Sequence, residues 1–275
     1  MAINLGEKYR PLLDERFAHE SFTEAAAGKE FDWDGVATIH VWTADQVTVN
    51  NYSRTAAGNR FGTPAELGDT VADYTLTQDK SFSFIIDKGN ATEQFNVKQA
   101  NKRLKVAWDE QITPLVDQRR LSVWATGAGL TVATAATLTK STIVEAIMTG
   151  NAAMSNNLVP LKNRYIFIGN TLFVAAKLSD QIQHSDSMAT EAYKNGLMGY
   201  LDGCPVIAVP DSYLPAKCNF LIKYKEASAD PIKLRTMRVH NDPPGIDGDL
   251  AEGRIIFDAF VRTPKANGIY KHVAP

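Results

Sequence analysis

The chain has 275 residues, of which 44% are hydrophobic, and its 29 Lys and Arg nearly balance its 31 Asp and Glu. This length and apolar content are sufficient to bury a large core, which excludes intrinsic disorder. No stretch approaches the ~20 apolar residues of a membrane-spanning helix, so we expect no membrane partner. A net charge of −2 argues against tight, charge-driven binding of nucleic acid.

The first segment has the composition of an arm rather than of a core element. Residues 11–27 show partial helical spacing, with Gly28 as the expected end, through Leu12, Leu13, Phe17 and Phe22. Because the apolar density of this segment is low, we expect the helix to pack on another part of the chain or on a neighbouring subunit.

From residue 36 the apolar period changes to two, which is typical of β-strands. Two alternating runs, 36–50 and 70–86, flank the polar and turn-rich segment Thr55–Pro64. This arrangement predicts an extended β-hairpin. A long hairpin with few apolar residues near its tip is not stable alone in water. We therefore expect it to be covered by the rest of the fold or by another chain.

Apolar residues then recur at three- and four-residue steps, which predicts a long helix over residues 93–125. Pro114 lies inside this helix, and we expect a kink or a break there. A basic cluster, which we interpret as a solvated face rather than a phosphate site, occupies the other faces: Lys98, Lys102, Arg103 and Lys105.

The second half alternates between helices and strands without a regular repeat. Residues 126–140 are small and loop-like, a candidate domain boundary, and Thr142 with Glu145 matches a capping box before a helix that ends near Met154. Asn170 is the expected cap of the next helix, after a buried strand. We predict strands over 164–169, 200–210 with an Asp-Gly turn, 220–224, 232–240, 254–262 and 268–273. This order indicates an α+β fold.

The sequence contains no pattern that predicts catalytic, cofactor-binding or metal-binding residues, so we expect neither an enzyme nor a cofactor. No two histidines have the helical spacing of a metal pair. Cys204 and Cys218 have no metal-site spacing and are expected to remain reduced, since residues 1–13 lack the pattern of a signal peptide. The acidic cluster over residues 242–252 lacks the spacing of a calcium loop and is interpreted as a solvated turn.

Four stretches, taken in order, resemble the major capsid proteins of tailed bacteriophages. The first two contain Ser21-Phe22-Thr23-Glu24 with Phe31-Asp32-Trp33-Asp34-Gly35, and Asn51-Tyr52-Ser53-Arg54 with Gln78-Asp79-Lys80-Ser81-Phe82. The last two contain Tyr200-Leu201-Asp202-Gly203-Cys204-Pro205-Val206, and Asn241-Asp242-Pro243-Pro244-Gly245 with Glu252-Gly253-Arg254. They span nearly the whole chain.

This resemblance implies the α+β phage major capsid protein fold. Its parts would be an N-terminal arm at 1–35, an extended loop with flanking strands at 36–90, a peripheral domain with a long spine helix at 91–127, an axial domain at 128–225, and strands that return to the peripheral domain with a C-terminal tail at 226–275. The hairpin would then lie over an adjacent subunit.

The resemblance also implies a function: a structural subunit of an icosahedral phage head, which self-assembles as hexamers and pentamers around packaged double-stranded DNA. A portal and a separate scaffolding protein are the expected partners, and DNA would be held by confinement. The protein would be assembled in the host cytoplasm and located in the virion. The alternatives are an encapsulin-like compartment shell and, more remotely, a small-molecule enzyme or binding protein.

The extended loop would supply intersubunit contacts, for which the candidates are Arg54, Arg60, Phe61, Glu66 and Asp69. Some relatives join their shells by a bond between a loop lysine and an asparagine of a neighbour. No lysine lies between Asn50 and Asp79 in this chain. We therefore expect a shell held by noncovalent contacts.

Overall fold

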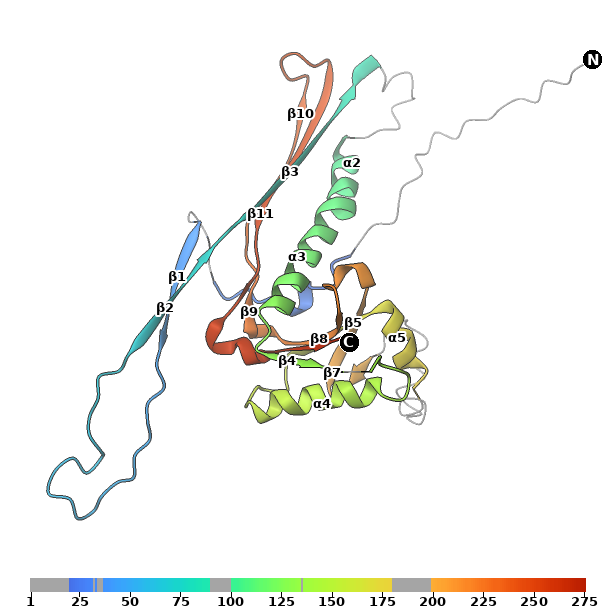
Figure 1. Cartoon of the computed structure of the whole chain (residues 1–275). Coiled ribbons are helices and arrows are strands. Elements are labelled where there is room, and N and C mark those ends of the chain that lie inside the picture. The colour runs from blue at the N-terminus through green and yellow to red at the C-terminus, as the bar shows by residue number, and fades with distance from the viewer. Residues whose placement is uncertain (1–19, 32, 34–36, 90–99, 135, 180–198) are drawn as a thin grey trace, which may run out of the picture. The chain divides into compact units, whose positions relative to one another are not determined.

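The computed structural model describes residues 20–31, 33, 37–89, 100–134, 136–179 and 199–275. The chain divides into two units, one of residues 1–32 with 77–275 and a smaller one, Trp33–Leu76. Figure 1 shows the elements of each unit. The expected arm helix lies largely outside the described residues, and within residues 20–31 the chain forms only the 3-10 turn η1 (Glu24–Ala26).

The smaller unit is an antiparallel hairpin with a long connecting loop. Strand β1 (Thr38–Ala44) pairs with β2 (Asp69–Thr75), in register from Thr38 opposite Thr75 to Ala44 opposite Asp69. One further backbone bond, from Asp45 N–H to the Gly68 carbonyl at 2.9 Å, extends the pairing into the loop. The connecting residues 46–67 contain no strand.

The hairpin prediction required the second alternating run to be one strand, but the structure shows that it is not. It divides at Leu76–Thr77, and its second half, β3 (Gln78–Asp87), pairs with β11 (Gly248–Phe257), which pairs in turn with β10 (Ile232–Asn241). Gly253 lies opposite Phe82, and a Cβ at Gly253 would lie 2.4 Å from the Phe82 ring. Alternation specifies a strand face but not a partner, and this glycine–aromatic fit supplies the partner.

The long helix runs from Ala100 to Thr126 in three consecutive pieces: α2 (Ala100–Ala107), the π-helical turn η2 (Trp108–Ile112) and α3 (Thr113–Thr126). Of the kink or break expected at Pro114, the break does not occur, because the three pieces are consecutive. A proline clashes with the carbonyl four residues back and cannot donate to it. In the wider turn the bond runs five residues back, from Thr113 N–H to the Trp108 carbonyl, which accommodates the ring. Residues 93–99 of the predicted helix lie outside the described residues.

A six-stranded sheet forms the centre of the larger unit. Its order is β4-β13-β8-β5-β7-β6, with bounds Leu130–Ala133, Ile269–Val273, Cys218–Tyr224, Arg164–Gly169, Cys204–Val209 and Tyr200–Leu201. The Asp-Gly turn is present between β6 and β7, where Asp202 and Gly203 both have positive φ. The expected boundary at 126–140 instead contributes β4 to this sheet.

Two apolar layers cover the faces of this sheet. Helices α4 (Ile143–Asn156) and α5 (Asn170–Lys177) pack on one face against residues such as Ile166, Phe220 and Tyr270. Helix α3 packs on the other through Leu121 and Trp124. Successive side chains of strand β13 point alternately into these two layers. Strand β13, which belongs to the segment expected to return to the peripheral part, lies in this sheet between β4 and β8.

The remaining elements are short: η3 (Asp211–Tyr213), η4 (Lys225–Ala227), β9 (Ser228–Ala229), β12 (Phe260–Val261) and η5 (Thr263–Gly268). β9 pairs with β12. A third apolar cluster joins the long helix to the three-stranded sheet, through Trp108, Ile112 and Val116 against Ile255 and Phe257.

The helix caps differ from the predicted ones. Thr142 occupies the N-cap of α4 but makes no side-chain cap bond, because its hydroxyl accepts from Thr139 N–H instead. Asn170 is the first helical residue of α5 rather than its cap, and Asp211 accepts from the N–H and hydroxyl of Thr171. A residue distant in sequence thus supplies the acceptor that the local pattern assigned to Asn170.

Arg164 on β5 closes the other end of α4. Its guanidinium is fully buried and donates to the carbonyls of Asn151, Val159 and Pro160 and to the Ser155 hydroxyl. Burial lowers the pKa of Arg164 from its ordinary value, but these acceptors offset the cost of removing the charge from water.

We predict that Arg164→Met lowers the free energy of unfolding by about 3 kcal/mol or more, because several buried acceptors lose their donor at once. Urea unfolding of the purified subunit measures this loss. The exposed neighbour Lys162 provides the control, and Lys162→Met is expected to change stability by less than about 0.5 kcal/mol. Equal effects of the two substitutions would contradict the assignment.

Candidate assembly surfaces

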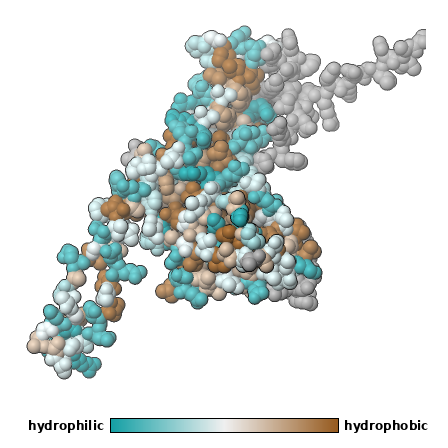
Figure 2. Space-filling view, in the orientation of Figure 1, coloured by the Kyte–Doolittle hydropathy of each residue, from teal (hydrophilic) through white to brown (hydrophobic). Residues whose placement is uncertain are grey.

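The loop of the smaller unit exposes apolar side chains that a folded protein normally buries. Val49 is 94% exposed and Phe61 is 83% exposed, and Val47 and Leu67 are also exposed. Figure 2 shows apolar patches among polar ones along the hairpin and its loop. Scattered apolar residues on a surface are ordinary, whereas contiguous apolar patches are typical of interaction surfaces.

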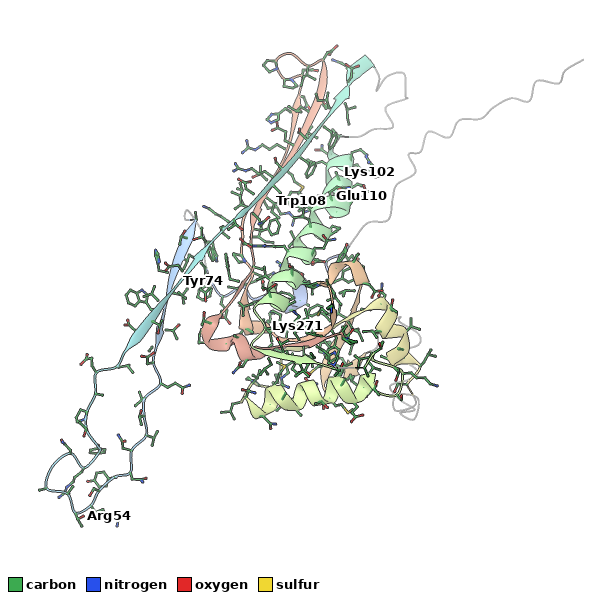
Figure 3. All side chains as sticks on the ribbon, viewed as in Figure 1. Arg54, Tyr74, Lys102, Trp108, Glu110 and Lys271 are labelled. Carbon is green, nitrogen blue, oxygen red and sulfur yellow. The ribbon has the colours of Figure 1, made fainter. Side chains whose placement is uncertain are left out.

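The structure gives each of the five predicted contact residues a position on this unit. Figure 3 places Arg54 at the end of the loop away from the strands. Arg60 folds back on its own loop, where its Nε donates to the Ala56 carbonyl at 3.0 Å. The Phe61 ring lies edge-on to Tyr52 with centroids 5.0 Å apart. Glu66 is exposed, and Asp69 is the first residue of β2.

One face of the hairpin carries a ladder of exposed cross-strand pairs that the sequence reading did not single out. The Thr38 and Thr75 hydroxyls are 2.9 Å apart, and His40 Nδ1 lies 2.5 Å from the Asp73 carboxylate. Trp42, which is 68% exposed, stands opposite Val71. Directly opposed side chains interact across strands. The pairs therefore align polar and apolar groups on one face.

A buried carboxylate, Asp258, holds the chain where it leaves the smaller unit. It accepts from the N–H and the hydroxyl of Thr77, at 2.9 and 2.7 Å, and from Nε of Arg119 on α3 at 3.0 Å. Asp258 is itself 1% exposed. Charge-assisted bonds of this kind are about twice as strong as neutral ones. Thr77, the first residue after the smaller unit, is thus tied to the long helix.

A second buried carboxylate, Asp117 on α3, holds the end of the N-terminal segment. It accepts from the Ser21 hydroxyl, the Phe22 N–H and the Thr23 hydroxyl, at 2.7, 2.8 and 2.5 Å. Three donors converge on this one side chain. They keep the carboxylate buried without an unsatisfied oxygen and fix the direction in which the N-terminal segment approaches the helix.

A third buried carboxylate, Asp230, fixes the next turn of the same segment. It accepts from Gly28 N–H and from Nε1 of Trp124, both at 2.9 Å, and from the Ser228 hydroxyl. The sequence predicted that Gly28 ends a helix, and this prediction is wrong. Gly28 is required because a Cβ there would lie 1.9 Å from the Ser228 carbonyl oxygen.

Lys223 completes this cluster from β8. Its fully buried ammonium donates to the carbonyls of Ala26 and Lys225, at 2.5 and 3.1 Å, and lies 4.3 Å from the centroid of the Trp124 ring. Burial lowers the pKa of Lys223 to about 8, and Asp230 opposes this shift.

Comparison with solved structures shows what kind of protein has this architecture. A capsid structure of the cyanophage P-SCSP1u superposes with a TM-score of 0.79 at 13% identity, covering 98% of this chain and 92% of that one. A structure of Mycobacterium phage Che8 superposes with 0.74 at 17% identity, covering 98% of each chain. The mature capsid of bacteriophage PhiM1 gives 0.74 at 11% identity, covering 100% of this chain and 92% of that one.

This chain has the phage capsid fold. No protein-family model matches its sequence, and no curated protein does either. The likeness is therefore carried by the three-dimensional arrangement over nearly the whole chain rather than by sequence identity. The expectation of an α+β fold of this type is confirmed.

Among the described residues, no helix is both long and apolar enough to cross a membrane. Within the same residues, no group of three or more His, Cys, Asp or Glu is arranged to hold a metal ion.

The sequence reading missed the buried polar residues that anchor the projecting segments of this fold, although one signal was available. Asp117 and Arg120 each lie four residues before an apolar residue of α3, Leu121 and Trp124, and so share its buried face. Charged residues at core positions of a helix must have partners. The sequence does not show which segments supply them.

We predict that Lys223 makes stability rise with pH above about 8. The unfolded chain keeps this proton up to its ordinary pKa near 10.4, so between about pH 8 and 10 unfolding takes up a proton. Below pH 8 the full cost of about 3 kcal/mol is present. The difference in unfolding free energy between wild type and Lys223→Met should rise by that amount over the interval. A flat difference in denaturant titrations would contradict the assignment.

Proposed function

We propose that this chain is the structural subunit of a phage head and forms the shell that encloses the genome. The full-length match to capsid structures, at TM-scores up to 0.79, carries the proposal. It is supported by the exposed apolar residues of the loop, which a neighbouring subunit would cover. The compared structures come from phages, so they do not favour an encapsulin-like shell, and nothing specific favours a small-molecule enzyme or binding protein.

We infer that the assembly consists of hexamers and pentamers of this chain, with a portal and a separate scaffolding protein as partners. A net charge of −2 supports confinement of DNA rather than tight binding to it. Assembly in the host cytoplasm and a final location in the virion follow from the same proposal. The subunit has a structural role and no catalytic one.

In this proposal the loop residues Arg54, Arg60, Phe61, Glu66 and Asp69 contact a neighbouring subunit. Their exposure supports this role, and Phe61 is the member with the most apolar surface to bury. Burying a phenylalanine side chain contributes about 1.5–3 kcal/mol. The charged members contribute less individually, because exposed ion pairs are worth about 0–1 kcal/mol each.

We predict that Phe61→Asp and Val49→Asp spare folding and impair shell formation. Both side chains are almost fully exposed, so the unfolding midpoint of the isolated subunit should not change. The protein concentration needed for assembly should rise about tenfold or more, because each 1.4 kcal/mol corresponds to a factor of ten. Light scattering and electron microscopy measure this concentration.

The exposed polar residue Thr63 in the same loop provides the matched control, and Thr63→Asp should assemble nearly as the wild type does. Wild-type protein that stays monomeric at high concentration, with scaffold and portal present, would overturn the proposed function. Normal assembly of both Asp variants would overturn only the role of the loop.

We also predict that the shell contains no covalent links between subunits. The loop contains no lysine from Asn50 to Asp79 to act as a nucleophile, and the amine would need burial to lose its proton. Particles boiled in denaturing detergent should give one band near 30.2 kDa. A ladder of multimers that survives reductant would disprove this and would implicate first Lys80 or Lys88.

A further inference from the structure

Arg120 on α3 is a buried guanidinium with only part of its hydrogen-bonding capacity used. The residue is 1% exposed, and its Nη1 donates to the Thr23 hydroxyl at 3.2 Å and to Glu24 Oε2 at 2.9 Å. Its Nε and Nη2 are buried and have no hydrogen-bond partner among the described residues. Buried guanidinium N–H groups without acceptors are strongly unfavourable, so this pair of atoms indicates a missing acceptor.

The nearby carboxylates are already engaged. Asp117 accepts three hydrogen bonds from residues 21–23, and Glu24 pairs with Lys29 as well as with Nη1 of Arg120. Both partners of Glu24 lower the pKa of its carboxyl, against the effect of burial. Neither carboxylate is bonded to the two unpaired nitrogens.

Nε and Nη2 together form the side of a guanidinium that binds a carboxylate with two parallel bonds. The chain contains an example of this geometry on β11 and β3. Arg254 donates from Nε to Asp79 Oδ1 at 3.0 Å and from Nη2 to Oδ2 at 2.5 Å. The unpaired atoms of Arg120 therefore match a carboxylate in both number and direction.

A groove of about 510 Å³ runs past Arg120 between the long helix and β10. Its walls are mainly apolar and include Trp108, Ile112, Val116, Ile232 and Ile255, and Arg235 lies over the Trp108 ring. Figure 3 shows Trp108 between the helix and the strands. Glu20, Glu24 and Asp109 also line it. The groove thus combines apolar and acidic lining residues with a buried cation.

We propose that this groove binds a segment of a second copy of the chain, whose carboxylate accepts from Nε and Nη2 of Arg120. The apolar lining would receive an apolar neighbour of that carboxylate, and Glu20 and Asp109 would receive a basic one. A second copy is the occupant because shell subunits meet each other on all sides. This choice rests on the proposed function, whereas the carboxylate specificity of the groove does not.

Arg120→Lys provides the main test, since lysine keeps the positive charge beside Thr23 and Glu24 but removes the two-nitrogen side. At concentrations below assembly, the unfolding midpoint of this variant should equal or exceed that of the wild type. Its concentration for assembly should rise at least tenfold. The neighbouring Arg119→Lys is the matched control. Its guanidinium bonds Asp258 within the chain, so this variant, unlike Arg120→Lys, should lower the midpoint.

A small probe tests the groove without assembly. 3-Phenylpropanoate carries a carboxylate and an apolar ring, and millimolar concentrations should raise the melting temperature of the isolated wild-type subunit. The alcohol 3-phenylpropanol, which lacks the carboxylate, should not do so, and Arg120→Lys should not respond to either compound.

Three outcomes separate the alternatives. The proposal would be overturned if Arg120→Lys assembled at the wild-type concentration, or if it lost stability as Arg119→Lys does. Either result would mean that the guanidinium is satisfied within its own chain, residues 1–19 included. An equal response of wild type and variant to the probe would also overturn the proposal. Wild type that never assembles but binds the probe through Arg120 would refute the proposed function and the second-copy occupant, while the carboxylate site would stand.

Discussion

The larger unit depends on one repeated interaction, in which a buried carboxylate ties a projecting segment to helix α3. Asp117 lies on the helix itself, Asp230 accepts from Trp124 of the helix, and Asp258 accepts from Arg119. Each of these carboxylates also accepts a backbone N–H from a segment distant in sequence, at Phe22, Gly28 and Thr77 respectively. The N-terminal segment and Thr77, the first residue after the smaller unit, are therefore both fixed to the same helix.

Buried carboxylates are an expensive way to join two segments, because each charge must leave water. An apolar contact would hold the same segments with less demand on geometry. Hydrogen bonds to a carboxylate are directional, however, so they fix where a segment emerges and which way it points. In the proposed shell, where subunits must meet at defined positions, this precision would matter more than additional stability.

The distribution of burial follows the same logic. The two apolar layers around the six-stranded sheet contain fully buried residues such as Phe167 and Ile222, whereas the loop of the smaller unit exposes Val49 and Phe61. The first set stabilises the subunit by itself. In the proposed shell, the second set would contribute stability once a neighbouring subunit covers the loop.

The sequence by itself determined the α+β class, the long helix, the buried strand Arg164–Gly169, the Asp-Gly turn and the exposed character of the loop. These features are local, because periodicity and turn chemistry depend only on nearby residues. Tertiary structure decided the rest. The partner of β3 depends on Gly253 opposite Phe82, the cap of α5 on Asp211, and the roles of Gly28, Asp117 and Arg120 on segments about 90 to 200 residues away. A single sequence records the residue types at such positions, but only the folded chain brings a donor and its acceptor within hydrogen-bond distance.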